Sequence, residues 1–166
     1  MKQAALLALG LLGCAHGAKP PAASPPEPVQ LSPEQVVVVA IAGPTRVSVG
    51  GNAEVTITLH IADGYHVMSD HPSNPLYIPT SLRVDSKPPL VWDSASFPAP
   101  HEFRLVDETI TTFEGDVVLR VPVHVAGDAM PGVYVSQVTL GYQSCTTANC
   151  LFPVKRALSV QLEVVP

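Results

Sequence analysis

The sequence predicts an all-β protein with an immunoglobulin-like β-sandwich fold. Several runs alternate apolar and polar residues with a period of two, turn-forming residues separate these runs at short intervals, and no segment keeps a helical period. The composition agrees, because 18 prolines and a charged fraction of 14% are more typical of a turn-rich β-protein than of a helical one. A chain of 166 residues is long enough for one domain with a substantial core.

The first residues have the pattern of an export signal. A short positive start, Met1-Lys2, precedes an apolar run over residues 4–12 that is too short to span a bilayer. The run ends in apolar and small residues directly before Cys14, as in bacterial lipoproteins, in which this cysteine becomes the lipidated N-terminus. We therefore expect a lipoprotein-type signal peptide over residues 1–14, lipidation of Cys14, and attachment of the protein to a membrane through that lipid.

Export defines the redox environment of the remaining cysteines. Cleavage after Gly17 is the alternative to lipidation. In either case Cys145 and Cys150 are the only thiols left in the exported chain. The bacterial periplasm, where we expect the chain, is a compartment in which disulfides form. Residues 15–35 are rich in proline and alanine and lack periodicity, which predicts an extended, semi-stiff tether. The folded domain would then cover residues 36–166.

From residue 36 onward the pattern is one of strands and turns, and about seven to nine short strands are expected. The three clearest runs each direct apolar side chains to one face and polar side chains to the other. Clusters of glycine, proline, asparagine and aspartate mark the turns between runs. The apolar positions of the three runs are Val55, Ile57, Leu59 and Ile61; Val117, Leu119, Val121, Val123 and Val125; and Leu158, Val160, Leu162 and Val164.

Two irregularities predict local departures from regular strand pairing. Within residues 133–140 the apolar parity changes between Val135 and Val138, which indicates a bulge or a crossover. Pro122 lies inside an alternating run and cannot donate a backbone hydrogen bond. We therefore expect the strand of Pro122 to lie at a sheet edge or to carry a bulge.

Several classes of function find no support in the sequence. The net charge is −5 and no basic run occurs, so nucleic-acid binding is not expected. No serine occurs in a nucleophile-elbow pattern such as G-x-S-x-G, which argues against a serine hydrolase. No segment after the expected signal is apolar enough for a transmembrane helix.

The most informative segment contains Cys145 and Cys150. A strand over residues 138–143 leads into the first cysteine, so residues 146–149 are expected to form a hairpin tip with the two cysteines facing each other across its base. A disulfide there would be a weak staple. Closing a loop of about six residues contributes roughly 2 kcal/mol, whereas a loop of about a hundred residues contributes about 5 kcal/mol.

A metal site, a redox pair and an inert bridge are the hypotheses that remain for this segment. Zinc is not favoured, because the cysteine spacing is atypical and no second pair exists. His66, Met68 and His71, acting with the thiols, would suit a soft metal such as copper in a copper-handling protein. An exported chain with one local dithiol fits thiol–disulfide exchange, and a binding or adaptor module with a structural disulfide is the other alternative.

The cysteine segment resembles that of a known family. Residues 142–153, YQSCTTANCLFP, look like the active-site segment of the N-terminal periplasmic domain of DsbD-type thiol:disulfide interchange proteins. Residues 63–68 and 78–84 are similar to the Gly-Tyr-His segment and the Ile-Pro-Thr strand of that family, and residues 112–115 give a weaker match. The resemblance covers about residues 36–165, which is essentially the whole expected domain.

The resemblance implies an immunoglobulin-like fold and a thiol–disulfide interchange role. In the family, this domain takes electrons from a membrane-embedded partner domain and passes them to periplasmic thioredoxin-like proteins. Carried over, Cys145 and Cys150 would be the catalytic pair, with Cys150 forming the mixed disulfide and Cys145 resolving it. The activity would be that of a protein-disulfide reductase without cofactor or metal.

The resemblance also implies how the chain meets its partners. The family's full-length protein adds a multi-helix membrane domain and a thioredoxin-like domain, and the sequence has neither. We therefore expect a monomer that exchanges electrons with thioredoxin-like periplasmic proteins and with a membrane-embedded electron donor in trans, and that contacts the membrane only through its lipid anchor.

Six further side chains are expected to line the site, and two of them, Asp107 and Glu108, belong to the stretch 106–110 described below. Tyr142 and Gln143 come just before the first cysteine of the matching segment. His66 and Met68 fall where some family members have aromatic residues beside the active site. These four side chains should therefore lie close to the cysteine pair.

The shielding of the cysteine pair is left open by the sequence. Some family members cover the pair with an aromatic cap loop. Residues 106–110 have the acidic residues of such a loop, Asp107 and Glu108, but no aromatic residue, and Phe113 follows the stretch late. An uncapped pair would exchange with partners less selectively.

Overall fold

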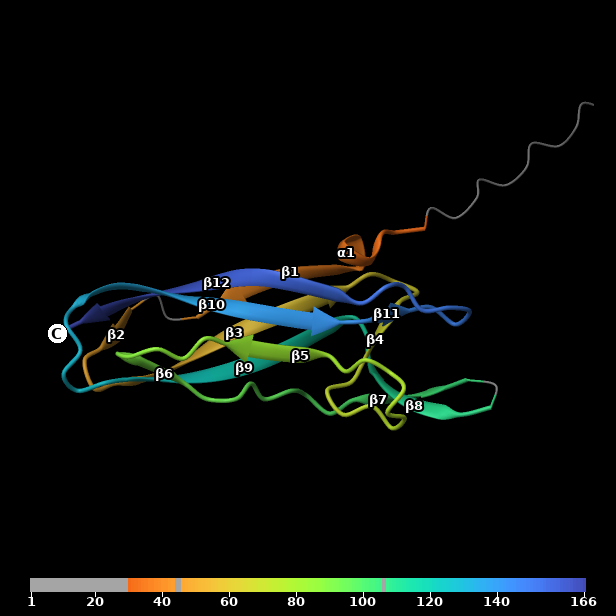
Figure 1. Cartoon of the computed structure of the whole chain (residues 1–166), viewed down its shortest axis with the longest axis horizontal. Helices are drawn as coiled ribbons and strands as arrows, with labels where there is room; N and C mark the ends of the chain where they lie inside the picture. The colour runs from red at the N-terminus through yellow and green to blue at the C-terminus, as the bar shows by residue number, and fades with distance from the viewer. Residues whose placement is uncertain (1–29, 44–45, 106) are drawn as a thin grey trace, which may run out of the picture.

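The computed structural model describes residues 30–43, 46–105 and 107–166, which form an almost entirely β-stranded structure (Figure 1). The expected signal peptide, Cys14 and the first part of the expected tether lie outside the described residues. No helix in the described part of the chain is long and apolar enough to cross a membrane. In chain order the elements are α1 (Pro33–Val36), β1 (Val37–Ala42), β2 (Arg46–Ser48), β3 (Asn52–Ile61), β4 (His66–Met68), β5 (Ser81–Val84), β6 (Leu90–Trp92), β7 (His101–Arg104), β8 (Thr109–Phe113), β9 (Asp116–Val125), β10 (Gly132–Tyr142), β11 (Ser144–Cys145) and β12 (Val154–Val165).

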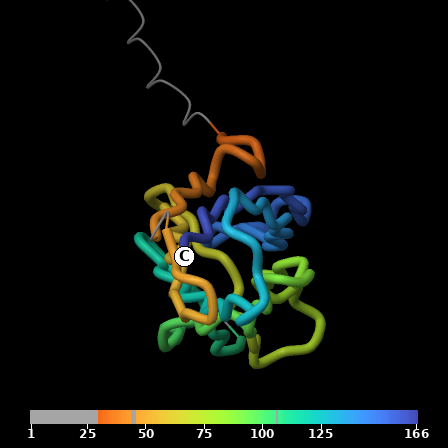
Figure 2. Tube along the Cα trace, turned by 90° about the vertical axis from the view of Figure 1, so that its left-hand side faces the viewer, coloured from red at the N-terminus to blue at the C-terminus, as the bar shows by residue number. Residues whose placement is uncertain are grey.

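Two four-stranded sheets form a sandwich around one core. The first sheet has the strand order β1-β3-β9-β6, and the second has the order β2-β12-β10-β5. Buried side chains of both sheets join one apolar cluster, which includes Leu59 and Leu119 from the first sheet and Leu140 and Leu162 from the second. Seen end-on, the blue C-terminal strands and the teal β9 lie on different sides of the molecule (Figure 2). The predicted immunoglobulin-like β-sandwich is therefore confirmed.

The alternating runs of the sequence become the long strands of this sandwich. In β3, β9 and β12 the side chains predicted to face inward are buried, apart from the half-buried Leu158. β3 and β9 pair without interruption from Asn52↔His124 to His60↔Asp116. Burying one large aliphatic side chain stabilises the fold by about 1.5–3 kcal/mol. Since a slip by one residue would expose every such side chain, the same pattern also fixes the register.

The bulge or crossover predicted within residues 133–140 is absent from β10. This strand pairs with β12 continuously along its whole length. Val133 and Val135 lie on the outer face with 59% and 60% exposure, whereas Ser136 is buried on the inner face. Nε1 of Trp92 donates a hydrogen bond of 2.9 Å to the Ser136 hydroxyl. The parity change therefore reflects a buried serine with a tryptophan partner, and the backbone pairing stays regular.

β9 is a central strand, so the prediction of a sheet edge or a bulge at Pro122 is wrong. β9 lies between β3 and β6, and its pairing with β3 runs through Pro122 without a bulge. Arg120 donates its N–H to the carbonyl of Ser96 on the side of β6, and residues two apart direct their N–H groups to the same side. The nitrogen of Pro122 therefore faces the chain between Trp92, where β6 ends, and Ser96. The regular backbone hydrogen bonds to β6 are interrupted there, so the N–H group that proline lacks costs little stability.

A third sheet, with the order β11-β4-β8-β7, extends from one end of the sandwich (Figure 1). β11 follows β10 after a single residue, Gln143. β8 leads into β9 through a turn at Gly115, whose positive φ of 61° favours glycine. Two of the long core strands therefore anchor this sheet, which carries the cysteine segment.

Residues 30–35, at the end of the expected tether, lie against the domain. The backbone N–H of Leu31 donates to the hydroxyl of Tyr65 over 3.3 Å, and the hydroxyl of Tyr142 donates to the carbonyl of Pro33 over 3.2 Å. Val36, the last residue of α1, is fully buried. Packing therefore begins a few residues before the expected domain boundary.

Leu119→Ala is expected to lower the free energy of unfolding by about 2–5 kcal/mol, because Leu119 is fully buried and its truncation leaves a cavity between the sheets. Val118 on the outer face is 38% exposed, so Val118→Ala should cost below about 1 kcal/mol. Urea unfolding followed by the fluorescence of Trp92 measures both variants. Equal losses would contradict the inward face assigned to β9.

Candidate functional site

Cys145 and Cys150 form a disulfide at the base of a hairpin, as the sequence predicts for their positions. The two residues make an antiparallel bridge, with Cα atoms 3.9 Å apart and an S–S bond of 2.04 Å. Thr146 N–H donates to the carbonyl of Asn149 over 2.8 Å, which closes the tip over residues 146–149. We call residues 144–151 the cysteine hairpin.

The two halves of the disulfide lie in different environments. Cys145 is 1% exposed and forms an apolar cluster with Met68 and Ile110. Cys150 is exposed. A group arriving from solvent therefore meets Cys150 first, whereas Cys145 is reached only through its partner sulfur or through the side chains that cover it.

Strand register explains why these side chains meet. β11 and β4 are antiparallel, with Cys145 opposite His66 and Ser144 opposite Val67. Directly opposite side chains share a face of the sheet, and so do side chains two residues apart on one strand. Cys145, His66 and Met68 therefore lie on one face, which we call the cysteine face, while Val67 points into the main core.

β8 and β7 extend the cysteine face. Met68 is opposite Thr112 on β8, and Ile110, two residues before Thr112, shares its face. Ile110 is in turn opposite Phe103 on β7. The cluster around Cys145 is thus built from four strands, and the partly buried Tyr77, Phe103 and Leu105 pack against it.

His66 is the titratable side chain opposite Cys145. It is 3% exposed, and its ring packs on that of Phe103 with centroids 4.3 Å apart and an interplanar angle of 33°. Burial lowers the pKa of His66 from its usual value and outweighs the negative charge of Glu114, which acts to raise it. His66 is therefore mainly neutral near pH 7 and does not supply a fixed positive charge to a thiolate.

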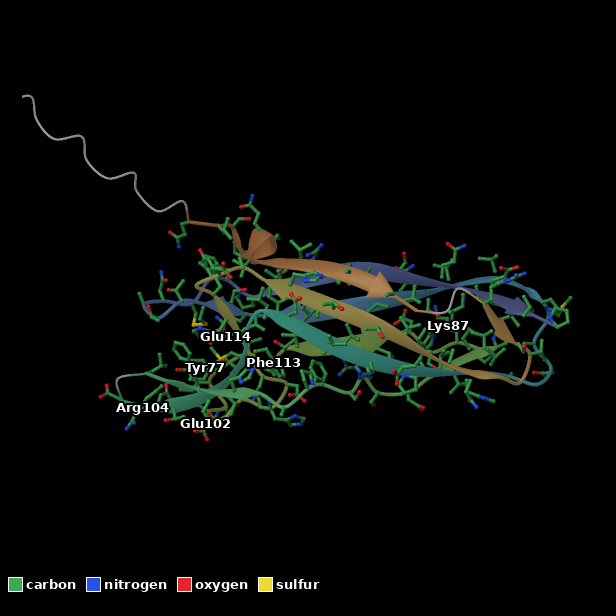
Figure 3. All side chains as sticks on the ribbon, turned by 180° about the vertical axis from the view of Figure 1, so that it is seen from behind. Tyr77, Lys87, Glu102, Arg104, Phe113 and Glu114 are labelled. Atoms are coloured by element: carbon green, nitrogen blue, oxygen red, sulfur yellow. A yellow bond between two sulfur atoms is a disulfide. The ribbon has the colours of Figure 1, made fainter. Side chains whose placement is uncertain are left out.

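An aromatic cover lies over the cysteine face, and sequence analysis missed it. Phe103 packs on His66, and Tyr77 joins Phe103 against the cluster around Cys145. Tyr77 and Arg104, the neighbour of Phe103, lie at the end of the molecule from which the third sheet extends, whereas Lys87 lies toward the other end (Figure 3).

The cover comes from outside the stretch where the sequence indicated a cap. Phe103 belongs to β7, which comes before residues 106–110. The sequence feature that could have pointed to Phe103 is its position as an aromatic residue between the charged Glu102 and Arg104. Phe113 belongs to the main core, on the opposite face of the third sheet, where its ring stacks on Phe97 at 6.0 Å.

Asp107 and Glu108 lie in the connection between β7 and β8. Glu108 accepts hydrogen bonds from the Tyr77 hydroxyl and, over 3.1 Å, from Nδ2 of Asn74. The hydrogen bond from Tyr77, with a smaller contribution from Asn74, holds the pKa of Glu108 below its usual value. Both acidic residues line a pocket of about 450 Å³ that also borders Thr147 at the tip of the cysteine hairpin.

Tyr142 and Gln143, which precede the cysteine hairpin, lie in different surroundings. Tyr142 is fully buried in the main core, and burial raises the pKa of its hydroxyl. Nε2 of Gln143 donates to the carbonyl of Leu151 over 3.2 Å, across the base of the hairpin. Gln143 is thus bonded to the end of the cysteine hairpin, whereas Tyr142 lies in the main core, away from the cysteine face.

The three side chains considered for copper do not converge. His66 and Met68 are buried on the cysteine face, whereas the His71 side chain is 92% exposed and bonded to Asp70 over 2.9 Å. Within residues 30–43, 46–105 and 107–166, no three or more His, Cys, Asp or Glu side chains are grouped so as to hold a metal ion.

Similarity to known proteins covers most of the chain. Residues 31–162 match the family model described as "Thiol:disulfide interchange protein DsbD, N-terminal". The DsbD N-terminal domain of Neisseria meningitidis in its reduced form is 21% identical, with a TM-score of 0.51, over 80% of this chain and 90% of that one. The N-terminal periplasmic domain of ScsB from Proteus mirabilis is 14% identical, with a TM-score of 0.51, over 75% of this chain and 45% of that one. At these identities the structural likeness shows the fold, and no curated protein matches the chain.

Phe103→Ala is expected to make Cys145 more accessible. An aromatic contact contributes about 0.5–1.5 kcal/mol, so its loss should increase the fraction of molecules in which the cover has moved away from Cys145. The rate at which iodoacetamide alkylates the reduced Cys145 thiol should then rise roughly two- to tenfold. Mass spectrometry of peptides from the reduced protein measures this rate at each cysteine. Phe97→Ala is the matched control, because Phe97 packs on the opposite face. A rate at Cys145 that is the same in wild type and Phe103→Ala would contradict the cover.

Proposed function

The chain belongs to the family of the N-terminal domain of the thiol:disulfide interchange protein DsbD, and on this premise we propose that it relays reducing equivalents to or from thioredoxin-like proteins outside the cytoplasm. Cys145 and Cys150 are the catalytic pair. One observation carries this proposal: the disulfide joins an exposed cysteine to one that is 1% exposed under an aromatic cover. A bridge with one accessible half and one protected half suits stepwise exchange.

Each cycle consists of two sulfur exchanges. In the dithiol form, the thiolate of Cys150 attacks a partner disulfide, which forms a Cys150–partner bond and releases one partner thiolate. The thiolate of Cys145 then attacks Sγ of Cys150, the internal disulfide forms, and the second partner thiolate leaves. Two electrons pass to the partner, and the reverse sequence takes two electrons from a donor dithiol.

The surroundings of Cys150 support its role as the sulfur that meets partners. A groove of about 690 Å³ beside Cys150 is lined by residues 30–33, 35, 143 and 149–153. Phe152 on this groove is 85% exposed. Exposed aromatic side chains are enriched at protein interfaces, so this groove suits the partner segment that carries the reacting disulfide.

The aromatic cover supports selectivity. Phe103 and Tyr77 cover Cys145, so small thiols and oxidants reach the pair only at the exposed Cys150. Asp107 and Glu108 on this connection border the tip of the cysteine hairpin and are thus available to a docking partner. A protein partner that reacts at Cys150 can therefore make contacts on this connection that a small thiol cannot make.

The expected export of the chain agrees with this role. We propose that residues 1–14 are a signal peptide, that Cys14 carries a lipid, and that the following tether lets a monomeric domain reach both its thioredoxin-like partners and a membrane-embedded electron donor. Exchange of this kind needs no cofactor and no metal, because the electrons move with the sulfur bonds.

Cys145→Ala is expected to accumulate mixed disulfides at Cys150 in cells, because the attacking thiol remains while the resolving thiol is gone. Non-reducing electrophoresis followed by mass spectrometry identifies the attached proteins, which should have thioredoxin-like sequences. Cys150→Ala is the matched control and should accumulate far fewer adducts, because the remaining thiol is buried.

Equal trapping by the two variants would contradict the roles assigned to the cysteines. Absence of adducts from both variants would contradict the exchange function itself and would favour an inert bridge in a binding module.

A further inference from the structure

Cys145 has a titratable neighbour on the third sheet, and a carboxylate follows the next strand of that sheet. On one side of β4, Cys145 is opposite His66. On the other side, β4 pairs with β8 from Met68↔Thr112 to Val67↔Phe113, and Glu114 directly follows the last residue of this pairing. The electrostatic effect of Glu114 on His66 agrees with this position, and Glu114 lies next to Phe113 at the end of the molecule that carries the third sheet (Figure 3). A thiol and an imidazole are therefore neighbours on one face of the sheet, and the exposed carboxylate of Glu114 acts on the imidazole through its charge.

The proposed exchange requires the buried Cys145 to lose its proton. Only a thiolate attacks a disulfide, and a thiol in apolar surroundings holds its proton more tightly than a thiol in water. Cys145 packs with Met68 and Ile110, and no lysine or arginine occurs between Cys145 and Cys150 to stabilise a thiolate. Efficient resolution of the mixed disulfide therefore needs a proton acceptor on the cysteine face.

His66 has the properties of such an acceptor. It is opposite Cys145 on the same face and is nearly as buried. Burial lowers its pKa, so the imidazole is mainly neutral near pH 7 and has a free nitrogen lone pair. The carboxylate of Glu114, which acts to raise the same pKa, stabilises the imidazolium once a proton has arrived.

The charged side chains of β7 next to Phe103 are not placed to act as the proton acceptor in place of His66. Glu102 and Arg104 alternate with Phe103 along β7 and therefore lie on the opposite face of the sheet. The titratable groups that face His66 from the elements packed against it are Cys145 from β11, Glu114 after β8, the exposed His101 further along β7, and Tyr77, whose hydroxyl is bonded to Glu108.

We propose that His66 accepts the proton of Cys145 in the step that resolves the mixed disulfide, with Glu114 as the residue that stabilises the resulting imidazolium. The inference rests on the proposed exchange function. The proton moves from Cys145 Sγ to an imidazole nitrogen of His66, the sulfur electron pair forms the bond to Sγ of Cys150, and the Cys150–partner bond breaks. The leaving partner thiolate then takes the proton from the imidazolium.

Glutathione disulfide, as the oxidant of the reduced full chain, allows the two steps to be timed separately. Acid quenching and mass spectrometry follow the glutathione adduct at Cys150. His66→Gln keeps a polar side chain without a titratable nitrogen and should slow resolution of this adduct at pH 7 about a hundredfold, as for loss of a general base. In the wild type, resolution should slow as the pH falls through the lowered pKa of His66, because the imidazolium cannot accept a proton. We call this fall in rate at low pH the acidic limb of the pH profile. It should be absent from His66→Gln.

Three further variants separate proton transfer from a structural role. In a Cys145→Ala background, formation of the glutathione adduct should proceed at the same rate with and without His66→Gln, because the first step does not use His66. Glu114→Gln removes the charge that raises the pKa of His66, so the acidic limb should move to lower pH. Glu102→Gln, on the opposite face, should leave the limb where it is.

The outcomes distinguish this inference from the exchange function. Resolution with the wild-type rate and pH profile in His66→Gln would overturn the role of His66 while leaving exchange intact. A wild-type chain that forms no adduct and no internal disulfide would overturn the exchange function and this inference with it. If His66→Gln does not fold, as judged by circular dichroism, the Glu114→Gln profile decides, and an unmoved acidic limb overturns the proposal.

Discussion

The two-residue pairing of β11 with β4 is the constraint on which the site depends. It sets Cys145 opposite His66, and the period of two along each strand then brings Met68 to the same face. A slip of one residue would turn Cys145 into the main core and bring Ser144 to the cysteine face. The long pairing of β10 with β12 holds this short contact in register, because β11 follows β10 after one residue and Leu151 N–H donates to the carbonyl of Ser144. Core packing and site geometry are thus parts of one hydrogen-bonded arrangement.

The same constraint produces the difference between the two cysteines. Cys145 is held by the sheet and covered from β7, whereas Cys150 lies on the return arm of the hairpin, outside the sheet and beside an open groove. In the proposal, access to solvent therefore belongs to Cys150, and proton transfer belongs to Cys145. In the proposed exchange the exposed sulfur meets a partner, and the buried sulfur lies on the face of His66, whose pKa is lowered by burial. This division is what a relay needs, since a fully exposed pair would react with any thiol and a fully buried pair would react with none.

The parts of the structure that sequence predicts are those that depend on local pattern. Alternation predicted β3, β9 and β12, and the close spacing of the cysteines predicted the hairpin, because in both cases the relevant neighbours are near in the chain or share one period. The misses depend on distant partners. Ser136 is buried because Trp92, 44 positions away, donates to it, and Pro122 is tolerated because β6 ends beside it. Phe103 covers Cys145 through a pairing of β7 with β8 that no local pattern reveals.

The reduction potential of the Cys145–Cys150 couple tests the central claim most directly. Equilibration of the full chain in glutathione buffers of graded ratio, followed by acid quenching and thiol labelling, gives this value. A relay predicts a potential above about −300 mV, within the range in which thioredoxin-like proteins and glutathione exchange electrons with it. A potential well below about −300 mV would mark a structural disulfide that resists reduction, and would contradict the account.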